Sequence, residues 1–342
     1  MKAVYLTGNR NVEVRDIPKP VLGTGKALIK IKVSGICGSD LHTYRRLPTP
    51  DYIPFVCGHE PCGVIEEIYE SAENLRVGQR VALFHYHGCG KCKYCASGLM
   101  QHCTNRTGFG SPRLPGGDAE YMLVNAYNAI PLPDSLSFVD GAFVACIAST
   151  AYRALSKLSL NIDKSLCIFG LGPVGLSAVK IAKVFCPSKI IGVDPNPKRR
   201  EIAKKLGIDY TFTGDDKTVD DIKSITNGGA NSVLETSGSI SAQINAVECA
   251  ARLGNIAITG LAGLYDKEGG VNLSRFLERE LSVYGSFVIS LNQFHELLAL
   301  MQTKNIHFDD LVTHRFPIEK AAEAFAVFDK GDTGKVIFEF GD

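Results

Sequence analysis

The sequence predicts an α/β protein that combines a β-rich domain with a doubly wound parallel sheet. Its first third consists of short β-prone runs, and beyond residue 165 apolar strands alternate with helical patterns. With 342 residues, the chain is longer than a single hydrophobic core usually supports. We therefore expect two domains, the β-rich one formed by residues 1–147 and 286–342 and the one with the parallel sheet by residues 148–285.

Short runs of β-prone residues fill the first third of the chain. Gly, Pro and polar turns separate these runs, which is typical of an all-β or barrel-like unit with long loops between its strands. The expected strands are 26–33, 63–69, 80–84 and 120–124.

Alternating strands and helices follow from residue 165, as in right-handed βαβ units. The expected strands are 165–169, 189–193, 210–212, 232–235 and 255–259. The helical patterns between them are 174–185, 197–206, 218–226 and 241–252. The chain should end with two helices and a strand, at 291–302, 318–328 and 335–340.

Composition and charge narrow the classes of function. Hydrophobic residues make up 45% and charged residues 21% of the chain, as in ordinary globular proteins. A net charge of +1 gives no global field that would attract nucleic acid or an anionic membrane. Residues 1–16 show no secretory signal, and no apolar run is long enough to span a bilayer. We expect a cytoplasmic protein whose partners include neither nucleic acid nor a membrane.

A glycine-rich turn separates the first alternating strand from the helix after it, and an acid ends the next strand. Such a turn brings unpaired N–H groups and the positive end of a helix dipole to the phosphates of a dinucleotide. The glycines allow a tight turn, close approach of the pyrophosphate and close packing of helix and strand. The expected cofactor-binding residues are Gly170, Gly172, Pro173, Val174, Gly175, Asp194 and Arg199.

Asp194 decides which dinucleotide the sequence favours. Its carboxylate would accept hydrogen bonds from the ribose hydroxyls and repel a 2′-phosphate, which favours NAD over NADP. Lys198, Arg199 and Arg200 follow closely and would favour that phosphate, unless they form the solvated start of a helix. We expect NAD.

Four of the eleven cysteines occur within one short stretch. Soft thiolates at such spacing suit tetrahedral Zn²⁺ and close its coordination, as in structural sites. Free thiols, a disulfide pair and an iron–sulfur cluster are the alternatives. The predicted structural zinc ligands are Cys89, Cys92, Cys95 and Cys103. Five others should be small core residues, namely Cys57, Cys62, Cys167, Cys186 and Cys249.

A second group of possible metal ligands precedes the cysteine-rich stretch. Cys37 lies in the segment ICGSDLH, and His59 and Glu60 lie in the segment GHE. Sulfur and imidazole nitrogen are suitable zinc ligands. A lone His beside Gly is more often an ordinary loop residue, so spacing alone does not assign a metal here.

Taken together, ICGSDLH, GHE, the four-cysteine stretch, GLGPVG and Asp194 resemble the zinc-containing medium-chain dehydrogenase family over essentially the whole chain. The resemblance implies a GroES-like catalytic domain with a structural zinc lobe and a Rossmann domain that binds NAD. It also implies an enzyme with two Zn²⁺ per chain, one catalytic and one structural. The partners would be a small alcohol or polyol substrate and further copies of the chain, in a homodimer or homotetramer.

Site residues can be transferred by matching position. Cys37 and His59 become ligands of the catalytic zinc. Cys146 stands where alcohol dehydrogenases of the family have a ligand cysteine, and Ala145 stands where many polyol-type members have an acid. A Cys₂His set leaves one coordination position open, as in catalytic zinc sites, and Glu60 or water is the alternative third ligand.

The resemblance also implies a route for the proton of the alcohol. The Ser39 hydroxyl would accept this proton, and His42 would pass it on through the cofactor ribose to solvent. The alternative for Ser39 is plain turn chemistry, because Gly-Ser-Asp forms a turn on its own.

The substrate class follows from weaker similarities. Residues 277–286 and Tyr44 resemble sugar-alcohol and sugar-alcohol-phosphate dehydrogenases, of the sorbitol and galactitol-phosphate types. We expect oxidation of a secondary hydroxyl group of a polyol or sugar derivative. Oxidation of simple alcohols and a non-catalytic binding protein of the same fold are the alternatives. Arg45, Arg46 and Arg113 could recognise a phosphate or be solvated loop charges.

Overall fold

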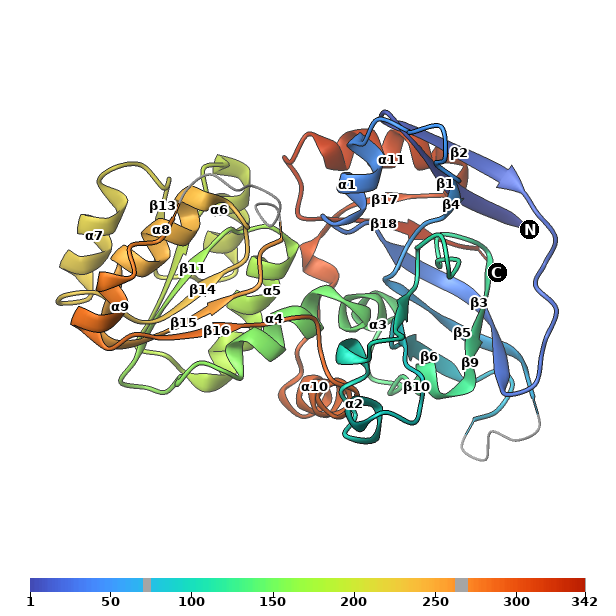
Figure 1. Ribbon diagram of the computed structural model, residues 1–342, viewed down its shortest axis with the longest axis horizontal. Helices are drawn as coiled ribbons and strands as arrows, with labels where there is room; N and C mark the ends of the chain where they lie inside the picture. The colour runs from blue at the N-terminus through green and yellow to red at the C-terminus, as the bar shows by residue number, and fades with distance from the viewer. Residues whose placement is uncertain (70–74, 262–269, 342) are drawn as a thin grey trace. The chain divides into compact units, whose positions relative to one another are not determined.

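A computed structural model of the chain describes residues 1–69, 75–261 and 270–341. The chain forms two compact units: the first comprises Met1–Ser149 and Ile289–Asp342, and the second comprises Thr150–Val288 (Figure 1). Within the described ranges, no single helix is long and apolar enough to cross a membrane. One pair of helices, α3 (Phe138–Ala145) and α4 (Ile147–Leu155), passes that test only jointly and is bent by 58°.

The first unit is rich in β-structure, as the sequence predicts. Its larger sheet runs in the order β10-β6-β5-β3-β18-β17, with β9 also paired to β3, and a smaller sheet has the order β2-β1-β4. The four expected strands of the first third correspond to β3, β5, β6 and β9. The strands are β1 (Lys2–Gly8), β2 (Asn11–Asp16), β3 (Lys26–Gly35), β4 (Phe55–Val56), β5 (Pro61–Ile68), β6 (Arg80–Leu83), β7 (Tyr86–His87), β8 (Thr107–Gly108), β9 (Tyr121–Asn125), β10 (Ala129–Pro131), β17 (Val312–Phe316) and β18 (Lys335–Glu339).

The alternation of side chains along β3 shows where the core of this sheet lies. Ala27, Ile29 and Ile31 share one face, because successive side chains of a strand point to opposite sides. All three are fully buried and pack with Val81, Leu83 and other apolar residues of the neighbouring strands. The helices of the unit are α1 (Asp40–Arg45), α2 (Lys93–Ala96), α3, α10 (Leu291–Lys304) and α11 (Ala321–Asp329).

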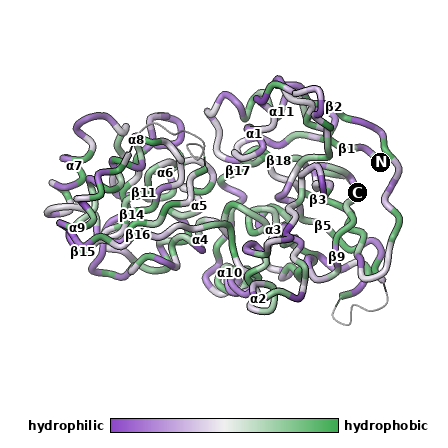
Figure 2. Tube along the Cα trace, viewed as in Figure 1, coloured by the Kyte–Doolittle hydropathy of each residue, from purple (hydrophilic) through white to green (hydrophobic). Residues whose placement is uncertain are grey.

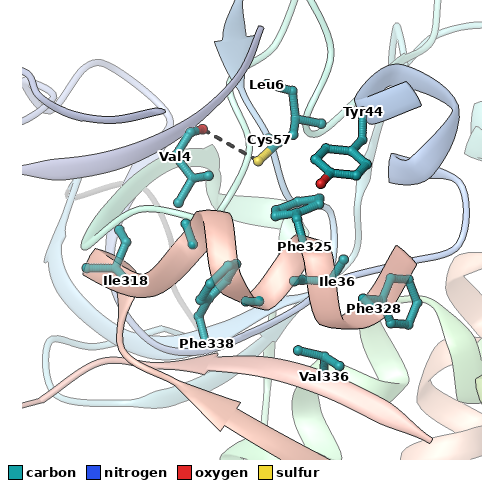
Figure 3. Close-up of a cluster of buried hydrophobic side chains, with 12 residues drawn as sticks. Val4, Leu6, Ile36, Tyr44, Cys57, Ile318, Phe325, Phe328, Val336 and Phe338 are labelled. Carbon is teal, nitrogen blue, oxygen red and sulfur yellow. Dashed lines mark hydrogen bonds between the residues drawn. The ribbon is translucent and has the colours of Figure 1, made fainter. Parts of the chain in front are cut away.

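A second cluster holds α1 in place, and with it the turn that contains Cys37. Phe325 of α11 packs against Tyr44 of α1 with a centroid separation of 5.4 Å (Figure 3). At the end of α11, the Asp329 carboxylate pairs with Arg45 at 2.5 Å and with Arg10 at 3.1 Å. The short helix α1 is therefore positioned by tertiary contacts with α11 rather than by its own length.

The second unit contains the predicted parallel sheet, which confirms the α/β fold class. The strand order is β13-β12-β11-β14-β15-β16, and every pair is parallel. The central strand β11 is buried along its whole length, as expected for a sheet with both faces covered. The elements of the second unit are β11 (Ser165–Phe169), α5 (Pro173–Ala182), β12 (Lys189–Val193), α6 (Pro197–Lys205), β13 (Tyr210–Phe212), α7 (Thr218–Ile225), β14 (Ala230–Glu235), α8 (Ile240–Glu248), β15 (Ala250–Ile258), α9 (Ser274–Arg279) and β16 (Ser282–Gly285).

Hydropathy along the chain follows this layering. Figure 2 shows mainly hydrophobic colour along α3, seven of whose eight residues are buried, whereas α6 carries five basic residues and is mainly hydrophilic. Helix α3 lies against the sheet of the first unit, and α6 keeps one broad face in water. The two helices illustrate buried and surface positions respectively.

The expected helix 241–252 is wrong at its end. Helix α8 stops at Glu248, and Ala250 already pairs with Ala230 of β14. The ladder then shifts, so that Ser232 faces Asn255 and the residues between bulge out around Leu253, which has φ 59°. Pairing in the sheet overrides the helix propensity of the Ala-Ala-Arg-Leu run.

One of the cysteines predicted to lie in the core is on the surface. Cys186 is exposed and adopts a left-handed conformation, φ 48°, after the 3₁₀ turn Lys183–Phe185 that follows α5. The turn tightens the end of the helix and directs the next residue outward. The prediction of a core position holds for Cys57, Cys62, Cys167 and Cys249, which are buried.

Candidate functional site

Three separate stretches of the first unit bring four ligand side chains together. Cys37 lies between β3 and α1, His59 and Glu60 lie between β4 and β5, and Cys146 follows α3. Their ligand atoms all lie within 4.8 Å of one another. The structure therefore unites the residues that the sequence suggested as the catalytic metal centre.

This donor set fits Zn²⁺. Zinc–sulfur and zinc–nitrogen bonds of roughly 2.3 and 2.0 Å in a tetrahedron place neighbouring ligand atoms about 3.5–3.8 Å apart, within the observed spread. Glu60 is fully buried, and its Oε1 has no hydrogen-bond partner among the described residues. A buried carboxylate beside two thiols and an imidazole is costly unless a cation compensates it.

Asp40 orients the imidazole of His59. Its Oδ1 lies 3.2 Å from Nδ1 of His59, and its Oδ2 accepts a hydrogen bond from the backbone N–H of Cys37 at 2.8 Å. With Nδ1 engaged, Nε2 is left as the coordinating nitrogen, and Ser39 Oγ lies 3.5 Å from it. One carboxylate thus fixes two of the candidate ligands.

The electrostatics of the cluster favour a thiolate at Cys37. The Cys146 thiol donates to its sulfur and, despite burial, the pKa of Cys37 falls well below its ordinary value. The same interaction raises the pKa of Cys146, because the two sulfurs share one proton. Burial lowers the pKa of His59, but the charges of Asp40 and Cys37 outweigh burial and raise it. A bound cation would replace these protons.

Lys335 is a site residue that the sequence analysis missed. It begins β18, is 1% exposed, and its ammonium pairs with Glu60 Oε2 and donates to the carbonyl of Ile36 at 2.8 Å. Gly35 leaves space for the Lys335–Glu60 pair, because a Cβ atom at this position would lie 2.3 Å from Glu60 Oε2. Burial raises the pKa of Glu60 to about 8 although Lys335 opposes the shift. The contact depends on the pairing of β18 with β3, so no local sequence signal reveals it.

His85 also lies beside the cluster and was not predicted. It follows β6, and its Nδ1 donates to the carbonyl of Ala145 at 2.8 Å. Its ring packs edge-on against that of His59 with a centroid separation of 5.5 Å. Burial lowers the pKa of His85 to about 3, so its imidazole is neutral.

The four cysteines of the cysteine-rich stretch form a second cluster. Their sulfur atoms lie within 4.8 Å of one another, with Cys92 and Cys95 sulfurs 3.5 Å apart and Cys89 and Cys95 sulfurs 4.0 Å apart. These separations bracket the roughly 3.8 Å expected between thiolates on one tetrahedral zinc ion. Backbone N–H groups of Lys91 and Cys92 lower the pKa of Cys89 to about 6, which favours its thiolate. The four thiols fit a closed Zn²⁺ site.

Replacing Cys92 by Ala should therefore lower the Tm by about 10 °C and release one metal ion per chain, because structural zinc contributes folding free energy directly. Calorimetry and metal analysis measure the two effects. Cys186→Ala is the control, since Cys186 is exposed and outside both clusters. A Cys92→Ala protein as stable as the Cys186→Ala protein would contradict a structural metal.

The glycine-rich turn of the second unit has the geometry that phosphate binding requires. Gly170 has φ +88°, and a Cβ at Gly175 would lie 1.9 Å from the carbonyl of Gly170. At Gly172 a Cβ would meet nothing closer than Arg199 at 3.8 Å, so the space above this residue is open. Pro173 and Val174 begin α5 with Gly172 as N-cap. The N-terminal N–H groups of α5 thus border open space.

Asp194 lies at the end of β12, where it holds the glycine-rich turn. Its Oδ2 accepts a hydrogen bond from Leu171 N at 2.7 Å, and its Oδ1 accepts one from Asn196 N at 2.8 Å. Arg199 Nη1 approaches Oδ2 to 3.7 Å, and the Arg200 guanidinium donates to backbone carbonyls instead. Each carboxylate oxygen keeps a lone pair for a further donor.

The remaining candidates lie on α1 and in exposed loops. His42 is exposed on α1, whereas Ser39 is the residue directly before this helix and is half-buried. Arg46 and Arg113 are exposed, and Arg45 is paired with Asp329. Of the three arginines considered for phosphate recognition, Arg45 is therefore already engaged.

Two family models, curated relatives and solved structures match this chain. A family model described as the alcohol dehydrogenase GroES-like domain matches residues 23–134, and one described as zinc-binding dehydrogenase matches residues 173–303. An uncharacterised zinc-type alcohol dehydrogenase-like protein of Escherichia coli is 35% identical, covering 100% of this chain and 99% of its own length. Sorbitol dehydrogenase of Bacillus subtilis is 31% identical, covering 95% and 92% respectively. The structure of 2R,3R-butanediol dehydrogenase from Bacillus subtilis superposes with a TM-score of 0.89 at 26% identity, covering 99% of both chains.

Proposed function

We propose that this chain, which belongs to the zinc-containing medium-chain dehydrogenase family and is an oxidoreductase, oxidises a secondary hydroxyl group of a polyol. The proposed hydride acceptor is NAD. The observation that carries this proposal is the buried cluster of Cys37, His59, Glu60 and Cys146. The reaction removes a hydride from carbon and a proton from oxygen, so the products are a ketone, NADH and H⁺. The relatives named for sorbitol and butanediol support a polyol.

Cys37, His59 and Cys146 would hold the catalytic zinc. Zinc bound there would supply Lewis acidity, which lowers the pKa of an alcohol hydroxyl group. Two thiolates and an imidazole leave a fourth position open, and Glu60 lies close enough to act as an exchangeable ligand. The four cysteines from Cys89 to Cys103 would hold a second, structural zinc.

Ser39 and His42 would remove the proton. Ser39 Oγ lies 3.5 Å from the His59 nitrogen that faces the cluster, so its hydroxyl is near the oxygen that loses the proton. His42 lies on the exposed side of α1 and can exchange protons with water. The two residues would connect the buried site to solvent.

NADH formation across a substrate panel tests the proposal. Polyols such as sorbitol and butane-2,3-diol should support faster reduction of NAD⁺ than their phosphates, because Arg45 is paired with Asp329, and Arg46 and Arg113 are exposed as solvated loop charges are. A preference for simple primary alcohols would favour the alternative of a general alcohol dehydrogenase. No turnover of any alcohol by protein containing two Zn²⁺ would contradict the proposed activity.

Preference for NAD over NADP should depend on the charge of Asp194. We expect Asp194→Asn to narrow the ratio of kcat/KM for the two cofactors by about tenfold or more, because the variant no longer repels a 2′-phosphate. The Asn oxygen can still accept the hydrogen bond from Leu171 N, which holds the glycine-rich turn, whereas the Asn amide N–H₂ group cannot accept the bond from Asn196 N. A wild-type enzyme with higher kcat/KM for NADP would contradict this role.

The edge of the parallel sheet supports a homo-oligomer, either a homodimer or a homotetramer. Strand β16 pairs with β15 on one side, all four of its residues are exposed, and Val283 and Tyr284 present apolar surface. Such an edge is a template for another chain. Light scattering should give a multiple of 37.0 kDa, and Val283→Lys should shift the protein towards monomer. A monomeric wild type would contradict this assignment.

The free cysteines fit a reducing, cytoplasmic setting.

A further inference from the structure

His85 contacts one candidate zinc ligand and the backbone beside another. Its ring lies against His59, and its Nδ1 is bonded to the carbonyl of Ala145, the residue that directly precedes Cys146. The side chain belongs to a residue that is only 5% exposed, and Tyr86 packs against it with a centroid separation of 4.4 Å. The position of the imidazole is therefore fixed relative to the ligand cluster.

The second ring nitrogen of His85, Nε2, is an unused hydrogen-bond acceptor. A carbonyl oxygen can only accept, so Nδ1 carries the proton and Nε2 presents a lone pair. Within the part of the chain that the structure describes, no group donates to Nε2. Nε2 of His87 is unpartnered and out of contact with solvent, whereas Nε2 of His85 is not among the described atoms that combine both conditions. Nε2 of His85 therefore keeps some contact with solvent, which a hydroxyl group of a bound molecule can replace.

We propose that His85 determines specificity by accepting, through Nε2, a hydrogen bond from the hydroxyl group next to the one that is oxidised. The substrate class it selects is a vicinal diol, with hydroxyl groups on neighbouring carbon atoms. This inference rests on the proposed oxidation of a polyol at the Cys37, His59 and Cys146 centre.

The chemistry of the acceptor explains the selection. While one hydroxyl group of the substrate reacts, only a second hydroxyl group can donate to Nε2. A simple alcohol of the same length would leave this nitrogen unpaired in a partly dehydrated site, which costs free energy. Sites that hydrogen-bond a substrate hydroxyl group discriminate against analogues that lack it for this reason.

Two variants of His85 separate the roles of its nitrogens. Asn places an amide N–H near the position of Nδ1 and can keep the bond to Ala145, but it cannot reach the position of Nε2. Gln places its amide near the position of Nε2 and retains an acceptor there. The measured quantity is the ratio of kcat/KM for butane-2,3-diol to that for butan-2-ol, with NAD⁺ and zinc-loaded enzyme.

We expect His85→Asn to lower this ratio roughly three- to tenfold, the effect of one hydrogen bond between uncharged groups, and His85→Gln to keep most of it. His87→Asn is the matched control and should not change the ratio. An unchanged ratio in His85→Asn, or an equal fall in both His85 variants, would overturn the proposal. Wild-type activity without preference for the diol would overturn it too, whereas absence of activity on both alcohols would also overturn the proposed function.

Discussion

Replacement of Cys37 by Ala should lower kcat/KM by about 10³-fold or more while leaving the protein folded. A Lewis-acidic zinc ion contributes several kcal/mol to the transition state, and each ~1.4 kcal/mol is a factor of ten in rate. Cys37 lies in a turn and is only half-buried, so its loss should not open the core. Steady-state kinetics, zinc analysis and circular dichroism measure the three consequences.

Metal content distinguishes this effect from a general disturbance. Cys37→Ala protein should hold one zinc ion instead of two, because the second cluster is built by other residues. Cys62→Ala is a suitable control, since Cys62 is buried in the same unit and its thiol donates to the carbonyl of Val81. That variant should keep both ions and most of the activity. Wild-type turnover by a Cys37→Ala protein would remove Cys37 from the ligand set.

The sequence predicts the second unit well because its signals are local. Strand, glycine turn, helix and acid follow one another within a single βαβ unit, and Gly175 is required by the adjacent carbonyl of Gly170. The error at the end of α8 arose where pairing with β14 overrides local propensity. The prediction of a core position for Cys186 was wrong because its apolar neighbours in the sequence do not reveal the 3₁₀ turn that follows α5 and directs Cys186 outward.

The candidate metal centre is only partly readable from the sequence. The lobe from Cys89 to Cys103 is evident from spacing, whereas Cys37, His59 and Cys146 lie far apart and are linked only by resemblance to a family. Lys335 and His85 carried no signal, because strand pairing brings Lys335 to Glu60 and a ring contact brings His85 to His59. Contacts between distant residues therefore complete the site.

At pH 9, above the pKa of about 8 that Glu60 has beside Lys335, Lys335→Met should destabilise the protein by about 3–5 kcal/mol, because the buried Glu60 carboxylate then loses its cationic partner. Met keeps the length of the side chain and most of its packing, so the loss of charge dominates. Denaturant unfolding measures the change. The same substitution at Lys320, which pairs with Glu323 on the surface and is 60% exposed, is the matched control and should cost less than about 1 kcal/mol.

A double variant shows whether charge is the cause. Glu60→Gln together with Lys335→Met removes both charges from the interior, and it should recover much of the stability lost in Lys335→Met alone. If Lys335 acted only through its donation to the carbonyl of Ile36, Glu60→Gln would give no recovery. Equal costs at Lys335 and Lys320 would show that the buried pair contributes no more than a surface pair. Recovery in the double variant would instead show that Lys335 is retained to compensate the carboxylate that lies beside the candidate zinc ligands.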